Sequence, residues 1–487
     1  MRAALTSSAD DLAAGVSLDA LFRSNARARP SAVALASPRA SPLSYAAADK
    51  AVERLARRLR SFRLPPGSVV AIQLPNIPVS VVSLLGVLRA GLVAAVVPMP
   101  WRRSDLVAAL STAQPKASIS VSQYGDERPA EVMCEAAAEL FQLSFPCAFG
   151  AVVPDGAIAL DQDDTDLPAL ETVTFSALGN ESAIITFDAM AEGFRPAARG
   201  HSQWLAVGLA VLLEAKIESG DTILTTLPAN SFAGVGASLV PWLLSGGTLK
   251  FVDAAIDSLD FNGDQAATHL IAPAGALEEL AGKRRDKFAS CVAVHRSPRS
   301  HGLDLGDIRS DRLADLFAFG EQGAVVLKRT QLAKARAIPI GPIAAPSSGS
   351  APVVIETHVQ QEELLLRGPM LPSAFANGRI GPGPVDMNGF TRTGYRCHAE
   401  PSGHLRVDEE PRGVVTIGGL RFGLADLQAR ITRCVPGAKV DAVPDELLGQ
   451  RIRITADDPL AAATALRSAG HGRMIVDAVI SKGRAKR

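Results

Sequence analysis

The stretch from Glu181 to Ala215 has the order of parts expected of a phosphate-binding site. The apolar run Ala183–Phe187 suits a buried strand, and a helix is predicted to begin at His201. Between them we expect a loop over Asp188–Gly200. In such a site, backbone N–H groups of the loop and of the helix N-terminus point at the anion. The residues expected to form the buried face of the helix are Leu205, Leu209, Leu212 and Leu213.

The composition of this loop does not suit phosphate. Glycines let a backbone turn its amides inward, but only Gly193 and Gly200 are present, and Glu192 adds a negative charge. The stretch therefore has the architecture of a nucleotide site without its usual chemistry.

Bulk composition excludes several classes of protein. The chain has 487 residues, 47% hydrophobic and 21% charged, which is typical of a packed globular protein of roughly two or three domains. The 50 basic and 50 acidic residues leave no net charge, so no nucleic-acid partner is expected. The cysteines are scattered without metal-ligand spacing, which predicts a reducing compartment and no metal site.

No export signal or membrane span is expected. Asp10 and Asp11 lie where a signal peptide would be apolar, so we expect a cytoplasmic protein. The apolar segment Val79–Val97 is interrupted by Arg89 and Gly91, and we interpret it as a buried helix that leads into a strand.

Helices and strands alternate in the first hundred residues. Ser17 and Ser44 are expected to cap helices. Short strands are predicted at 32–36, 68–73 and 94–97. This alternation predicts an α/β fold with a parallel sheet covered by helices on both faces. The buried stripe of the second helix would be Val52, Leu55, Ala56 and Leu59.

The amino-acid sequence of the same region resembles the N-terminal sequence of the adenylate-forming superfamily, which includes acyl-CoA synthetases, luciferases and peptide-synthetase adenylation domains. The matching segments are LDALFRSNARARPSAVAL, LSYAAADKAVERLARRL, PPGSVVAIQLPN and GVLRAGLVAAVVPMP. Later stretches continue the likeness, including LVPWLLSGGTLKFVD, ATHLIAPAGALEEL and LLLRGPM.

This resemblance implies the fold and the domains. We expect a large N-terminal domain (1–408) of doubly wound mixed sheets with helices and a small β-barrel-like subdomain. A small, mobile α+β domain would follow (409–487). The implied reaction joins a carboxylic acid to AMP, using ATP and Mg, and then forms a thioester with a thiol such as CoA.

The family's phosphate cradle, Thr-Ser-Gly-Thr-Thr-Gly-x-Pro-Lys, corresponds here to Phe187–Arg195. Arg195 replaces the lysine, while Asp188 and Glu192 oppose a polyphosphate. Both a nucleotide site that uses Arg195 and an ordinary surface loop fit these residues.

Other nucleotide positions are also altered. The family's Tyr-Gly-x-Thr-Glu corresponds to Phe319–Gly323. Phe319 and Gly320 would shape an adenine pocket, Gln322 replaces the threonine, and Gly323 removes the metal-binding glutamate. Glu321 would help only in a rebuilt loop; otherwise we expect it to be a solvated charge. Tyr395 takes the place of the ribose-binding aspartate.

The remaining candidates lie at the hinge, the tail and the acyl pocket. Arg412 is the expected hinge residue, and Arg484, or Lys482 beside it, would replace the family's catalytic lysine. A second interpretation, of equal weight, is that the tail is a basic segment that matches the family's final motif by chance. The acyl pocket would use Ser231, Phe232 and Gly234. Its small residues are also typical of close helix packing.

Two functions from different classes follow. The first is a divergent acyl- or aryl-acid ligase that retains the AMP-dependent route. The second is a catalytically inactive homologue that binds an acyl group, an adenylate or a partner protein, or a transferase that takes a ready-made activated acid. Expected partners are a small carboxylic acid or acyl group, and a second copy of the chain or another protein.

Overall fold

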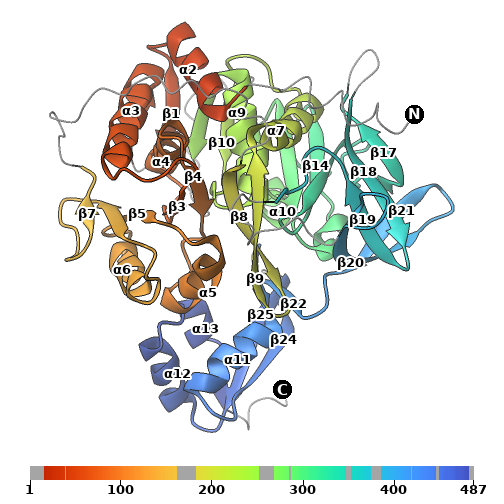
Figure 1. Cartoon of the computed structure of the whole chain (residues 1–487). Helices are drawn as coiled ribbons and strands as arrows, with labels where there is room; N and C mark the ends of the chain where they lie inside the picture. Colours follow the sequence, from red (N-terminus) through yellow and green to blue (C-terminus); the bar gives the residue numbers. More distant parts are fainter. Residues whose placement is uncertain are drawn as a thin grey trace.

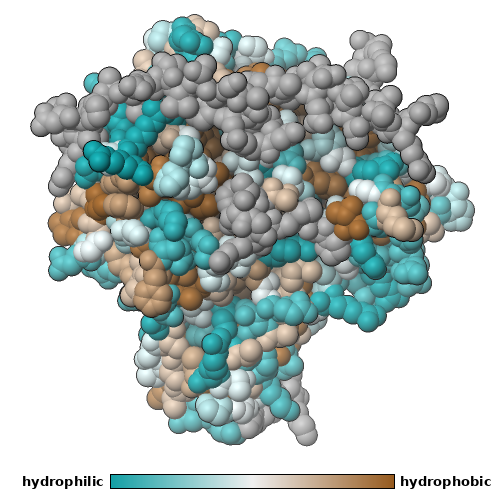
Figure 2. All heavy atoms as spheres, in the orientation of Figure 1, coloured by the Kyte–Doolittle hydropathy of each residue, from teal (hydrophilic) through white to brown (hydrophobic). Residues whose placement is uncertain are grey.

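The computed structural model describes residues 16–38, 40–161, 182–251, 268–283, 287–346, 352–374, 385–417, 419–445 and 449–481. Figure 1 shows the C-terminal elements below the rest of the chain, and in Figure 2 they form a narrow lower lobe under a broad upper one. Among the described helices, none is long and apolar enough to cross a membrane.

The first sheet of the upper lobe has seven strands in the order β7-β6-β5-β3-β4-β8-β9. All neighbours are parallel except β8 and β9. Every residue of β3 and β4 is buried, as expected of parallel strands covered on both faces. The strands are β3 (Val69–Ile72), β4 (Val93–Val96), β5 (Ala117–Val121), β6 (Phe145–Phe149), β7 (Ile158–Ala159), β8 (Ser182–Met190) and β9 (Gly193–Gly200).

The second sheet has eight strands in the order β15-β14-β13-β12-β10-β11-β1-β2. Its inner pairs are parallel, and the outer pairs β1–β2 and β14–β15 are antiparallel. The strands are β1 (Val33–Ser37), β2 (Ala40–Ser44), β10 (Thr222–Thr225), β11 (Thr248–Phe251), β12 (Thr268–Pro273), β13 (Ser290–His295), β14 (Leu313–Phe319) and β15 (Gly323–Lys328).

The predicted N-terminal helices are confirmed. Ser17 caps the first by accepting from the Ala20 N–H at 3.0 Å, and Ser44 caps the second by accepting from the Ala47 N–H at 3.2 Å. The predicted stripe of the second helix is buried. These helices and those that follow are α2 (Leu18–Ala28), α3 (Tyr45–Ser61), α4 (Pro78–Arg89), α5 (Arg103–Ala113), α6 (Pro129–Glu139) and α10 (Ala274–Lys283).

Helix α7 (His201–Ala215) differs from the prediction in the face that it buries. Trp204, Val207 and Val211 are fully buried, whereas the four predicted leucines are only partly buried. The reason is that α7 contacts β14 and β15 as well as η1 (Val235–Leu239) and α9 (Val240–Ser245). A helix that is covered on several sides is apolar all round, so leucine spacing does not identify one buried face.

An antiparallel sheet and the C-terminal elements complete the chain. The sheet order is β16-β21-β20-β19-β18-β17. Its strands are β16 (Ile338–Pro339), β17 (Gly341–Ala344), β18 (Val353–Gln360), β19 (Glu363–Arg367), β20 (Thr391–Ala399) and β21 (His404–Glu409). The C-terminal elements are β22 (Val414–Ile417), β23 (Leu420–Gly423), α11 (Leu424–Cys434), β24 (Lys439–Asp445), β25 (Gly449–Ala456), α12 (Pro459–Ser468), α13 (Arg473–Val476) and β26 (Val479–Ser481).

The C-terminal elements have an apolar cluster of their own, which includes Val415, Leu427, Ile431 and Ile454. The predicted α/β class, with mixed sheets and a small C-terminal unit, is confirmed. The boundary at residue 409 stays a prediction.

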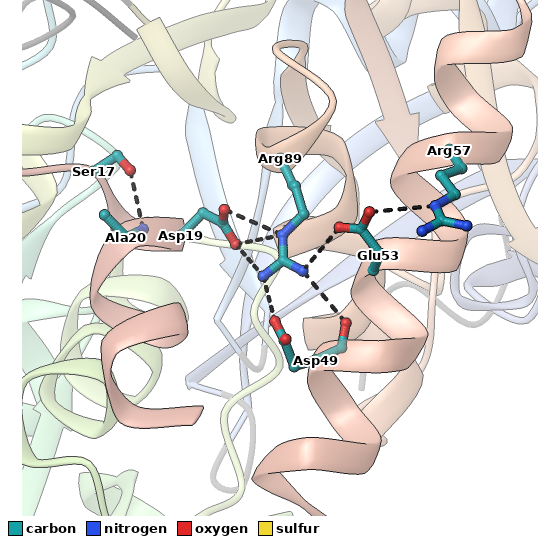
Figure 3. A network of polar contacts seen from close by, with 7 residues as sticks. All are labelled: Ser17, Asp19, Ala20, Asp49, Glu53, Arg57 and Arg89. Carbon is teal, nitrogen blue, oxygen red and sulfur yellow. Dashed lines mark hydrogen bonds and ion pairs between the residues drawn. The ribbon is translucent and has the colours of Figure 1, made fainter. Parts of the chain in front are cut away.

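A buried arginine ties three helices of the upper lobe together (Figure 3). Arg89 of α4 is 6% exposed. It forms ion pairs with Asp19 of α2 at 2.8 Å and with Asp49 of α3 at 2.7 Å, and a longer one with Glu53 at 3.5 Å. Because Asp19 is itself 7% exposed, each of these charges depends on the other for compensation.

Replacement of Arg89 by methionine should destabilise the protein strongly. The Asp19 carboxylate would stay buried without its cation, which costs about 3–5 kcal/mol when a buried pair is broken. Urea unfolding would measure this loss. Arg57→Met is the matched control, because its pair with Glu53 is about one third exposed and is expected to contribute less than about 1 kcal/mol. Equal effects of the two substitutions would contradict this account.

Candidate active site between the two lobes

The predicted phosphate loop is wrong: residues 188–200 belong almost wholly to a β-hairpin. Strands β8 and β9 pair antiparallel, with Asp188 opposite Arg195 and Met190 opposite Gly193. Only Ala191 and Glu192 lie outside the strands. A turn of two residues cannot wrap its amides around a phosphate, because their N–H groups are too few and lie at the hairpin end.

The end of this hairpin contacts the C-terminal lobe (Figure 1). The Ala191 carbonyl accepts from the Asp426 N–H at 3.1 Å. Gly423 lies so close to the Met190 carbonyl that a Cβ atom there would overlap it. The backbones of the two lobes are therefore in direct contact.

Asp188 is the polar centre of the interface. It is 3% exposed, and its carboxylate accepts from the Glu321 N–H at 3.1 Å and from Gln322 Nε2 at 3.3 Å. It also forms an ion pair with Arg421 of β23, across the two lobes. The second position of the expected cradle thus holds a carboxylate already paired with a cation of the protein itself.

Arg421 is enclosed by the residues around this pair. Burial alone would lower the pKa of Arg421, but the charges of Asp188, Tyr395, Glu410 and Glu321 together outweigh burial and hold that pKa above its ordinary value. Gly320 has a φ of +58°, and a Cβ there would overlap both Arg421 and Asp188. Only glycine combines this conformation with this approach.

The predicted adenine and ribose positions are packed against each other. Phe319 is 1% exposed and Tyr395 is 2% exposed, and their ring centroids lie 5.5 Å apart in an edge-on arrangement. The Tyr395 hydroxyl oxygen accepts from the Gly320 N–H at 3.1 Å. Burial raises the pKa of Tyr395 to about 12, so the phenol stays protonated at neutral pH.

Glu321 is not the solvated charge that we expected from the sequence. It is 3% exposed, accepts from the Phe232 N–H at 2.6 Å and pairs with Arg296 at 3.0 Å. Burial raises the pKa of Glu321, and Arg296 opposes that rise. The neighbouring Gln322 is also buried, with its amide donated to Asp188.

The other predicted residues lie at different distances from this cluster. Arg195 is partly buried, and burial lowers its pKa while Asp188 opposes that change. Arg412 is exposed. Lys482 and Arg484 lie outside the described residues.

Of the three predicted acyl-pocket residues, Ser231 lines the cleft between the lobes. Ser231 caps the short α8 (Phe232–Gly234) by accepting from the Gly234 N–H at 3.2 Å. Phe232 is fully buried beneath the Arg199 guanidinium, 4.3 Å from its ring centroid. A Cβ at Gly234 would overlap the Pro228 carbonyl, so this glycine is required for close packing.

A cleft lies between the lobes beside this cluster. Ser231 and Glu321 line it from the predicted set, together with residues that sequence reasoning did not single out as site residues, including Trp101, Arg296 and Arg421. The complete lining is Pro98, Trp101, Phe187, Asn230, Ser231, Arg296, Glu321, Gly419, Leu420 and Arg421.

A second buried ion pair crosses the interface near the cleft. Arg430 of α11 pairs with Asp105 of α5 at 2.8 Å and with Asp426 at 2.9 Å. Its side chain is 6% exposed and that of Asp105 is 3% exposed. Two such pairs on different elements resist rotation of the C-terminal lobe in this arrangement, because rotation would separate buried charges.

The Asp188→Asn substitution should weaken the contact between the lobes. It preserves the shape of the side chain but leaves Arg421 as a buried charge, which predicts a loss of about 3–5 kcal/mol in urea unfolding. The double variant with Arg421→Met removes both charges and should recover part of this loss.

Glu356→Gln provides the control for that experiment, because it breaks a pair with the more exposed Arg367 and should cost less than about 1 kcal/mol. Strictly additive effects of Asp188→Asn and Arg421→Met would show that the two charges do not depend on each other.

Comparisons with known proteins agree with this fold. The sequence model of the AMP-binding enzyme family matches residues 22–167. The glycine betaine reductase ATRR of Emericella nidulans is 45% identical over 74 residues, which are 15% of this chain and only 6% of that protein. This local match therefore does not assign the activity of that whole protein to this chain.

Solved structures match across the two lobes. The apo structure of Mycobacterium smegmatis MbtA aligns with a TM-score of 0.63 and 19% identity, over 96% of this chain and 91% of that one. The o-succinylbenzoate CoA synthetase of Bacillus subtilis aligns with a TM-score of 0.67 and 14% identity, over 89% and 88%. The anthranilate CoA ligase AuaEII, solved with anthranoyl-AMP, aligns with a TM-score of 0.65 and 13% identity, over 92% and 87%. The N-terminal part of this chain is thus similar in sequence to AMP-binding enzymes, and the chain shares its fold with these solved structures.

Proposed function

We propose that this chain binds an acyl group or a related acid in the cleft between its lobes and does not activate it with ATP. The observation that carries the proposal is the packing of the nucleotide positions. Tyr395 lies against Phe319 and Gly320, and Arg421 is paired with Asp188. These contacts use the groups that a nucleotide would need.

The residues present do not fit Mg-ATP. Tyr395 offers a neutral hydroxyl, already bonded to a backbone N–H, where a ribose would need a carboxylate. Gly323 has no side chain to bind a metal, and the nearby Glu321 is engaged by Arg296 and the Phe232 N–H. A triphosphate would also meet the carboxylate of Asp188 at the start of the cradle.

The comparisons favour an acyl ligand over other small molecules. The anthranilate CoA ligase AuaEII was solved in complex with anthranoyl-AMP, and the Bacillus subtilis synthetase was solved with a product analogue. This chain has a cleft between corresponding lobes, lined by apolar and cationic side chains. The proposal thus keeps the acyl ligand of the superfamily and drops the ATP-dependent step.

Calorimetry with the full chain tests the proposal directly. We expect no heat from Mg-ATP up to millimolar concentration, and no pyrophosphate release when a broad panel of carboxylic acids is added with Mg-ATP. The physical reason is that nucleotide binding would require separation of the buried Asp188–Arg421 pair.

The Arg195→Ala variant serves as the control for nucleotide binding. Micromolar binding of ATP that this substitution abolishes would show that Arg195 holds the phosphates, and it would overturn the proposal in favour of an AMP-dependent ligase. Arg195 is the appropriate residue because it lies opposite Asp188 on the paired strand.

A further inference from the structure

The connection between α12 and α13 of the C-terminal lobe packs against the start of α5 in the upper lobe. Figure 1 places α11 and α13 directly below α5. The Gly470 carbonyl accepts from the Ser104 N–H at 3.2 Å. A Cβ atom at Gly470 would overlap the Arg103 side chain. His471, which follows Gly470, is therefore held at the interface between the lobes.

The imidazole of His471 is buried at this contact. The residue is 5% exposed, and among the described residues its Nδ1 atom has no hydrogen-bond partner. A neutral imidazole has one donor and one acceptor nitrogen, whereas the protonated ring has two donors, and each of these needs an acceptor. The surroundings of His471 thus suit the neutral ring better than the charged one.

Cationic side chains outnumber anionic ones around this ring. Arg430 and Arg433 of α11 and Arg103 of α5 act on His471, against the carboxylate of Asp105. Burial first, and the charge of Arg430 next, lower the pKa of His471 below its ordinary value of 6.5. The ring is therefore neutral at neutral pH.

The Asp105 carboxylate is already engaged by other donors. Its Oδ1 accepts from Arg430 at 2.8 Å, and its Oδ2 accepts from the Arg102 N–H at 3.3 Å. Asp426 pairs with the same Arg430 guanidinium at 2.9 Å. A protonated His471 would compete with Arg430 for Asp105, and this competition would weaken an ion pair that joins the two lobes.

Other charges close to this contact have little effect on the ring, because solvent screens exposed charges. Glu139 of α6, which pairs with Arg103 at 3.3 Å, has a side chain that is 51% exposed. The charged residues that flank His471 in the chain are exposed as well: Arg467, Arg473 and Asp477.

We propose that His471 makes the docking of the C-terminal lobe sensitive to acid. The neutral ring packs into the interface, and the protonated ring is accommodated when the lobe moves away from α5. This inference goes beyond the proposed function, because it concerns the arrangement of the lobes and does not depend on which ligand the protein binds.

Proton linkage determines the direction of the effect and its pH range. The pKa of His471 is lower in the docked arrangement than in an open one, so the open arrangement binds more protons as the pH falls. Docking should be insensitive to pH above about 7. It should weaken as the pH falls below 6.5, by up to about tenfold at pH 5.5.

Hydrogen exchange of the full chain at pH 8 and pH 5.5 tests the proposal. The reporters are the N–H groups of Ser104 and Asp426, which donate to carbonyls of the opposite lobe at 3.2 and 3.1 Å. Their protection factors, which correct for the effect of pH on intrinsic exchange, should fall by about three- to tenfold at pH 5.5. Strands β3 and β4 of the upper lobe should keep their protection.

Two results of this comparison would overturn the proposal. A smaller fall at Ser104 and Asp426 would show that the interface is insensitive to acid. An equal fall in β3 and β4 would show acid unfolding of the upper lobe instead of separation of the lobes.

Substitutions at His471 separate its charge from its shape. His471→Gln keeps a neutral polar side chain, so we expect the lobes to stay docked at both pH values. His471→Lys carries a permanent charge and should lower interface protection at pH 8 as well. A fall at pH 5.5 that persists in His471→Gln would contradict the proposal, and so would equal loss of docking in both variants at pH 8.

His201→Gln is the matched control for a buried histidine outside the interface. Burial lowers the pKa of His201 to about 4, and its Nδ1 accepts from the Leu18 N–H at 3.3 Å within the upper lobe. The fall in interface protection at pH 5.5 should persist in this variant. Its disappearance would assign the acid response to the upper lobe rather than to His471.

Discussion

The buried ion pair between Asp188 and Arg421 determines the arrangement of the whole interlobe region. It joins β8 of the upper lobe to β23 of the C-terminal lobe. A buried charge is tolerated only when it is paired, so separating these two residues is costly. The same carboxylate also accepts from the Glu321 N–H and the Gln322 amide, and it thereby positions the strand connection that follows Phe319.

Neighbouring residues pack closely around this pair. Gly320 leaves room for Arg421, and its N–H is satisfied by the Tyr395 hydroxyl oxygen. Together with Phe319, whose ring lies against that of Tyr395, these residues form a packed cluster at the interface between the lobes.

The sequence predicts the fold better than the site, because the two depend on different kinds of interaction. Ser17 and Ser44 cap helices through bonds to residues three positions away, and such local signals are visible in the chain. The strand β9, which we expected to be part of a loop, forms because it pairs with β8. Its own composition, with two glycines and a proline, does not predict a strand. Sequence reasoning places Glu321 in solvent because its partner Arg296 is distant in sequence. The pairing of Asp188 with Arg421, 233 residues apart, has no local sequence signal that could predict it.

The interface between the lobes and the cleft share one residue, Arg421. Arg421 forms its ion pair through Nη1, and among the described residues Nε and Nη2 have no hydrogen-bond partner. If the guanidinium served only to dock the lobes, these donors would be expected to meet backbone carbonyls, as Nε and Nη2 of the equally buried Arg199 do at Met370, Glu321 and Gln322. Arg199 leaves only Nη1 without a hydrogen bond, and its guanidinium lies against the rings of Trp204 and Phe232 rather than in the cleft. Arg421 thus contributes both to the contact between the lobes and to the lining of the cleft.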